Sequence, residues 1–194
     1  YQLQQVRSAF DSGDLAAYRK QVKRFLSLIS DMDALLATDS QFLLGTWQKR
    51  ALDWGDSRQE KALMDKSAKM LITTWIDQVP RSLNDYSNRQ WAGLVSDFYL
   101  PRWKTFFEFQ MDVLTGKKTR EAAHAAFMDK MVRDELAFAG NGKIYSAKPA
   151  GDTLAVANRV MNTHREMLDA LSAGEKHSSG RPWALQQGSP LQFD

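Results

Sequence analysis

Residues 85–106 read DYSNRQWAGLVSDFYLPRWKTF and are the most informative stretch of the chain. Large apolar residues recur there at three- and four-residue spacing, as they do along one side of a helix. They are Trp91, Leu94, Val95 and Phe98. Asn84 or Asp85 is of the type that caps a helix by accepting from its first-turn N–H groups. Pro101 removes a backbone donor, so the helix must kink there or restart with Pro101 in its first turn.

Outward from this segment, the helical period recurs in five further segments, and no segment alternates as a strand does. These segments run from about 15 to 38, 39 to 55, 57 to 75, 119 to 138 and 152 to 171, after a short stub that ends near residue 10. Most of them begin at Asp, Ser or Thr, and residues 57–60 (SRQE) form a capping box. The short connections predict mostly antiparallel neighbours. We therefore expect an all-α bundle of about six helices over residues 1–173, followed by a polar, largely irregular tail over 174–194.

The composition excludes several classes of protein. The 194 residues are 43% hydrophobic and 25% charged with a net charge of +3, but no block of like charge suggests nucleic-acid binding. No apolar run approaches the roughly 18 residues of a membrane span. Cysteine is absent, which excludes disulfides and thiolate metal sites. The chain begins with Tyr1 rather than Met and shows no signal peptide, so we expect a piece of a longer protein whose upstream part is missing.

Few residues suggest catalysis or metal binding. Glu121 and His124 form a Glu-x-x-His pair, the spacing that di-iron helical bundles use, but no second pair accompanies it. A surface position on a helix is therefore expected, with no metal site. No P-loop, dinucleotide-binding turn or nucleophile elbow occurs, and no cofactor is expected. A Ser-His-Asp arrangement stays open, although nothing in the sequence points to one.

Three short motifs, in this order, resemble one known family. They are DSQFLLGTW at residues 39–47, DYSNRQWAGL with the following YLPRW in 85–103, and GDT at 151–153. Together they are similar to the helical C-terminal region of α-N-acetylglucosaminidases, glycoside hydrolase family 89, in register from about residue 28 to 160. The resemblance implies a parent hydrolase that acts outside the cytoplasm: periplasmic or secreted in a bacterium, lysosomal in an animal.

The resemblance also implies that the chemistry lies elsewhere in that parent. The family places both catalytic carboxylates on a preceding (β/α)8 barrel, which needs roughly 250 residues of alternating strands and helices. This chain contains no such pattern, and its acidic residues lie mostly at caps or on charged helical faces. We therefore expect a non-catalytic domain that supports the barrel and helps shape the pocket for a terminal α-linked N-acetylglucosamine.

By position in the family pattern, three residues are carried over as sugar contacts: Trp75, Leu83 and Tyr86. A Trp ring offers a flat apolar face to a pyranose, and a Tyr hydroxyl can hydrogen-bond a sugar oxygen. The chain departs from the family after Trp75, where it has Ile76 in place of the expected Gly. The alternative for Trp75 is an ordinary core position at a helix end. Arg102 is expected to be structural and could hold a carboxylate through its planar fork.

Other aromatic residues are expected to pack in the core, because each lies on an apolar stripe. They are Trp47, Trp91 and Trp103. A further aromatic group is expected to leave an apolar face for the missing barrel: Phe98, Tyr99, Trp103, Phe106, Phe107 and Phe109. The alternative function is a free-standing helical module that binds a protein partner through an apolar groove.

Overall fold

The computed structural model describes residues 1–75 and 85–175, and the regular structure in that part is helical. Its α-helices are α1 (Gln2–Asp11), α2 (Leu15–Leu36), α3 (Leu44–Leu52), α4 (Arg58–Leu71), α5 (Leu100–Leu114), α6 (Arg120–Ala139), α7 (Thr153–Thr163) and α8 (Arg165–Glu175). A 3-10 turn spans Ser40–Phe42, and a π-helical turn spans Val95–Tyr99. The all-α prediction is confirmed. Most of the predicted irregular tail, from residue 176 onward, lies outside the described residues.

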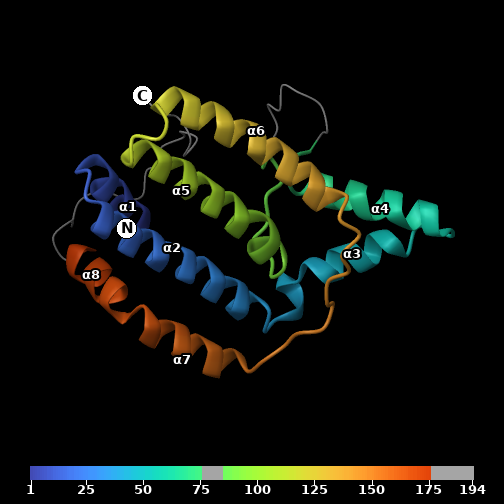
Figure 1. The fold of residues 1–194 in the computed structure, drawn as a ribbon. Coiled ribbons are helices and arrows are strands. Elements are labelled where there is room, and N and C mark those ends of the chain that lie inside the picture. The colour runs from blue at the N-terminus through green and yellow to red at the C-terminus, as the bar shows by residue number, and fades with distance from the viewer. Residues whose placement is uncertain (76–84, 176–194) are drawn as a thin grey trace.

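The helices form layers that run roughly side by side (Figure 1). α6 packs on α5, α5 on α2, and the α7–α8 pair lies along the far side of α2. α1 pairs with α2, and the α3–α4 hairpin extends from one end of the bundle. None of the helices within 1–75 and 85–175 is both long and apolar enough to cross a membrane.

The first of two apolar cores joins α1, α2, α5 and α6. Its buried members are Val6, Ala9, Tyr18, Phe106, Phe107, Phe127 and Met131. Burying the Tyr18 ring requires a partner for its hydroxyl, which lies within hydrogen-bond distance of two acceptors, the carbonyl of Phe107 at 3.1 Å and Oε1 of Gln110 at 2.9 Å. The aromatic side chains of α5 therefore fill the bundle's own interior.

That interior packing corrects the expected apolar face. Phe98, Phe106 and Phe107 are buried. Tyr99, Trp103 and Phe109 are partly buried, each packed against one of the two cores. The prediction that these residues lie exposed was wrong, because α2 and α6 cover the stripe on both sides.

The second core lies where α3, α4, α6 and the π-helical turn meet. Its buried members are Leu44, Ile72, Leu94, Phe98 and Phe138. Trp47 and Trp91 pack against it, and Trp47 donates its indole N–H to the carbonyl of Ala68 at 2.9 Å. Trp103 packs in the same way against the first core. The core assignment of these three tryptophans is confirmed.

Residues 85–93 are not helical, contrary to the prediction. Residues 85–87 form a turn, and helical structure begins only at Leu94. Ala92 uses its backbone elsewhere: its N–H donates to Phe42 at 2.7 Å, and its carbonyl accepts from Leu44 at 3.1 Å. Pro101 lies in the first turn of α5, directly after the π-helical turn, so the predicted restart of the helix is confirmed.

The backbone pairing of Leu43 with Ala92 is part of a tight junction, which comprises residues 42–45, 92–93 and 145–146. A Cβ added to Gly45 would lie 2.2 Å from the carbonyl oxygen of Ser146, so only glycine admits this approach. Two of the sequence motifs thus meet here. The third motif, which begins at Gly151, lies nearby. The residue before it, Ala150, donates its N–H to the carbonyl of Ala37 at the end of α2 at 2.8 Å.

The predicted last helix is interrupted at His164, which separates α7 from α8. Asp31 on α2 anchors this break: its carboxylate accepts from Arg159 at 2.6 Å and from the His164 Nε2 at 2.8 Å. Arg24 and Glu166 add a more exposed ion pair at 2.8 Å. These polar contacts therefore help to hold the outer helix pair on α2.

This anchor predicts an acid-sensitive contribution to stability. Burial alone would raise the pKa of Asp31, but the hydrogen bonds and charges of Arg159 and His164 outweigh burial and lower it below its usual 3.8. A carboxylate with a lowered pKa stabilises the fold at neutral pH, and that contribution is lost as the pH falls through the folded-state pKa. The free energy of unfolding of the unsubstituted 194-residue chain, measured in urea, should therefore fall more steeply between about pH 5 and pH 3 than that of Asp31→Asn. Parallel curves for the two proteins would contradict the anchor.

Candidate functional site: the Trp75–Tyr86 edge

Two of the three residues predicted to contact a sugar lie together. The rings of Trp75 and Tyr86 pack edge to face with their centroids 5.3 Å apart. Trp75 is half-buried just after α4, whereas Tyr86 is 71% exposed. Leu83 lies outside the described residues. We call the described pair the Trp75–Tyr86 edge.

The backbone on both sides of this edge has an uncommon conformation. Trp75 has a φ of 64° and Asp85 a φ of 59°, a region that bulky side chains rarely adopt. Two hydrogen bonds hold these residues: Trp75 donates to Met70 at 2.7 Å, and Asp85 donates to Thr73 at 2.8 Å. Conformations of this kind persist where the surrounding structure enforces them, and they cluster at ligand-binding sites. A left-handed residue just after a helix, bonded back into its last turn, is also a common form of helix end, so the assignment of Trp75 to a site stays a prediction.

Asp85 does not cap a helix, which corrects the sequence interpretation. Its two carboxylate oxygens accept from the fork of Arg102, at 2.6 Å from Nη1 and 3.2 Å from Nη2. The Nη2 atom also bonds Glu135 on α6. The predicted ability of Arg102 to hold a carboxylate is confirmed, with two carboxylates in place of one.

Two of the three members of this ion cluster are shielded from solvent, whereas the side chain of Asp85 is 31% exposed. The side chains of Arg102 and Glu135 are 13% and 3% exposed. Burial alone would lower the pKa of Arg102, but its bonds to Asp85 and the charge of Glu135 outweigh burial, so the pKa is raised. Burial, reinforced by the Asp85 carboxylate, raises the pKa of the neighbouring Tyr99 to about 12. At physiological pH the cluster therefore holds a charged guanidinium beside a neutral phenol.

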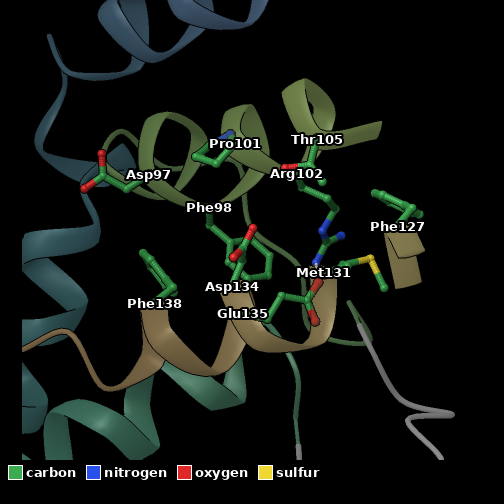
Figure 2. Close-up of a pocket in the computed structure, with 10 residues that line it drawn as sticks. All are labelled: Asp97, Phe98, Pro101, Arg102, Thr105, Phe127, Met131, Asp134, Glu135 and Phe138. Atoms are coloured by element: carbon green, nitrogen blue, oxygen red, sulfur yellow. Dashed lines mark hydrogen bonds and ion pairs between the residues drawn. The ribbon is translucent and has the colours of Figure 1, made fainter. Parts of the chain in front are cut away.

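A small cavity adjoins the cluster between α5 and α6 (Figure 2). Figure 2 shows Arg102 reaching from α5 towards Glu135 on α6, beside the ring of Phe98. The cavity measures about 30 Å³, which is enough for a water molecule. Small-molecule sites are typically at least ten times larger. The cavity thus belongs to the packing around the ion cluster and is too small for a sugar.

The Glu-x-x-His pair does not form a site. Glu121 and His124 both lie on the exposed side of α6, as predicted. Among residues 1–75 and 85–175, no three His, Cys, Asp or Glu side chains gather closely enough to hold a metal ion.

Sequence reasoning missed a second buried cation, Lys69, which is fully buried. Its ammonium donates to Asp65 at 2.8 Å, to Asn141 at 2.9 Å and to the carbonyl of Lys143 at 3.3 Å. The only local signal is Asp65 four residues before Lys69, a spacing that usually marks a surface pair. Asn141, the distant partner, could not be identified from local spacing.

Comparison with known proteins gives one consistent result. The family model of the alpha-N-acetylglucosaminidase (NAGLU) C-terminal domain matches residues 1–163. Human alpha-N-acetylglucosaminidase is 31% identical over 159 residues, which are 81% of this chain and 21% of the human protein.

Solved structures agree with this match. A family 89 glycoside hydrolase from Clostridium perfringens, in complex with 2-acetamido-1,2-dideoxynojirmycin, superposes with a TM-score of 0.71 at 25% identity. That match covers 83% of this chain and 19% of the hydrolase chain. A further structure, titled as CpGH89 from the same organism in complex with its substrate GlcNAc-alpha-1,4-galactose, has a TM-score of 0.70 at 24% identity. It covers 86% of this chain and 20% of that one, so the chain spans about a fifth of these relatives.

Proposed function

The chain belongs to the family of α-N-acetylglucosaminidase C-terminal domains, and from this premise we propose that it supports the catalytic barrel of such an enzyme. In this proposal the domain also completes the pocket for a terminal α-linked N-acetylglucosamine. The observation that carries the second part is the Trp75–Tyr86 edge. There the mostly exposed Tyr86 packs against Trp75 on a constrained backbone.

The chemistry of the edge suits a sugar. The apolar C–H face of a pyranose can lie on an aromatic ring, and a phenol hydroxyl can bond a sugar oxygen while its ring packs on protein. Trp75 is half-buried, and its ring lies beside the exposed Tyr86 ring. Leu83, the third expected contact, is included in this proposal only because of its position in the family pattern.

We propose that the domain itself is non-catalytic. A glycosidase normally needs two carboxyl groups that face each other across the sugar. Asp85, next to Tyr86, and Glu135 are both bonded to Arg102 beside a cavity of about 30 Å³. The partner that supplies the reacting carboxylates would be a (β/α)8 barrel of the same parent chain. The parent would act outside the cytoplasm, in the periplasm, after secretion or in a lysosome.

The experiment that tests this proposal compares two proteins. The product of the full gene should hydrolyse an aryl α-N-acetylglucosaminide, whereas the 194-residue chain alone should show no turnover. Turnover by the chain alone, abolished by one Asp or Glu substitution, would refute the non-catalytic role. The aromatic residues expected to face the barrel pack in the cores instead, so the supporting role rests on family membership alone, and a full gene without a barrel would favour the free-standing interaction module.

In the parent enzyme, Trp75→Ala and Tyr86→Phe should each lower kcat/KM by a factor of roughly 5–150. Losing a stacking face or a hydroxyl contact costs about 1–3 kcal/mol in the transition state. Trp91→Ala is the control: its ring packs beside Trp47 in the second core, so it should mainly lower the melting temperature. The measurement is kcat/KM beside the melting temperature for the three variants. Activity lost only in proportion to stability would remove Trp75 and Tyr86 from the site.

A further inference from the structure

The guanidinium of Arg102 connects the buried interior of the bundle to the exposed Trp75–Tyr86 edge. We propose that Arg102 is a positioning residue, which sets the place of Tyr86 and Trp75 by holding Asp85. This inference rests on the proposed function, because it concerns the residues assigned there to the sugar.

The first step is that the interior fixes the guanidinium. Glu135 on α6, with a side chain only 3% exposed, accepts from Nη2. The Cζ atom of Arg102 lies 4.5 Å from the ring centroid of Phe98 and 5.5 Å from that of Tyr99. Ion pairing with α6 and packing on two rings leave the planar group little freedom to turn. Arg102 is therefore part of the rigid α5–α6 core.

The second step is that Arg102 fixes Asp85. The fork holds both carboxylate oxygens, at 2.6 and 3.2 Å, while the Asp85 N–H donates to Thr73 at 2.8 Å. Asp85 is thus held through its side chain and its backbone at once. Its φ of 59° is uncommon for a residue other than glycine and needs such support. Without the fork, this backbone conformation loses its principal side-chain restraint.

The third step leads from Asp85 to the edge. Tyr86 is 71% exposed, so burial cannot fix its ring, and its direction depends on the backbone at Asp85. Its ring contact with Trp75, at 5.3 Å, transmits that position to the indole. Arg102 does not itself reach a sugar in this scheme, because its side chain is 13% exposed and both ends of the fork are occupied.

The first test measures the position of Trp75 in the 194-residue chain. With 5-fluorotryptophan incorporated, the ¹⁹F resonance that disappears in Trp75→Phe reports that indole. Asp85→Asn keeps the size of the side chain and tolerates a positive φ, but it offers the fork one acceptor oxygen in place of two and carries no charge. Arg102→Lys keeps the charge but cannot bond both carboxylates in one plane. Both substitutions should shift or broaden the Trp75 resonance well below the melting temperature.

The matched control is Asp31→Asn, which removes a different shielded carboxylate that also bonds an arginine, on the α2–α7 side of the bundle. It should leave the Trp75 resonance in place. If Arg102→Lys fails to fold, Asp85→Asn carries the test alone. An unchanged Trp75 resonance in folded Asp85→Asn overturns the inference.

The second test measures turnover of an aryl α-N-acetylglucosaminide by the parent enzyme. Arg102→Lys and Asp85→Asn should each lower kcat/KM about tenfold, within the roughly hundredfold that a 1 Å misplacement can cause. Asp31→Asn should leave kcat/KM unchanged. If Trp75→Ala lowers activity while Arg102→Lys and Asp85→Asn both keep full activity, the inference fails and the proposed function stands. If Trp75→Ala and Tyr86→Phe also keep full activity, the inference and the proposed sugar-binding role of the edge both fail.

Discussion

Replacing Lys69 with methionine should lower the free energy of unfolding by about 3–5 kcal/mol. The ammonium is fully buried and bonds Asp65 at 2.8 Å, and the substitution leaves that carboxylate buried without its counter-ion. Gln48 still donates to Asp65 at 2.7 Å, but an amide cannot balance the charge. Urea unfolding of the 194-residue chain measures the loss.

A surface pair provides the control for this prediction. Lys49 bonds Asp53 at 2.9 Å with both side chains more than 60% exposed, so Lys49→Met should cost less than about 1 kcal/mol. The double variant Lys69→Met with Asp65→Leu should recover most of the lost stability, because a buried ion pair can often be replaced by apolar residues at little cost. If Lys69→Met costs no more than Lys49→Met, the buried network contributes nothing and the prediction is wrong.

The second large effect is expected at Gly45, where alanine should lower the free energy of unfolding by roughly 3 kcal/mol. The added methyl would lie 2.2 Å from the Ser146 carbonyl oxygen and 2.5 Å from that of Tyr145. Both are backbone atoms, so relief requires the whole 145–146 segment to move. That movement would also strain the hydrogen bond from the Tyr145 N–H to Gln48, at 2.8 Å.

Gly140→Ala is the matched control for the Gly45 substitution. Gly140 ends α6 with an ordinary φ of −96°, and a Cβ there would meet only the carbonyl of Leu136 at 3.6 Å. Its effect should stay within about 0.5 kcal/mol. Equal effects at the two glycines would show that the junction yields to a methyl group, contrary to the geometry.

The helical class and most helix starts could be predicted because local side chains decide them. Asp14, Thr119 and Asp152 each accept a first-turn N–H, and Ser57 with Glu60 closes the predicted capping box. The segment at 85–93 was misassigned for a non-local reason. Its apolar spacing is compatible with a helix, but its backbone pairs with residues 42–44, and spacing along the chain does not record a distant partner.

The candidate site could be predicted only in outline. The resemblance supplied Trp75 and Tyr86, and the structure brings their rings together. The positive φ at Trp75 and the fork that reaches Asp85 have no local signature. Asp85 was assigned as a cap because Asp accepts equally well from a helix N-terminus and from an arginine.

The junction also bears on how the chain folds. The α1–α2, α3–α4 and α5–α6 pairs are neighbours in sequence, so their contacts close short loops and can form within microseconds. The pairing of Leu43 with Ala92 closes a loop of roughly 50 residues. The close contact between Gly45 and Ser146 closes a loop of roughly 100 residues. Local helical hairpins should thus form before the junction closes.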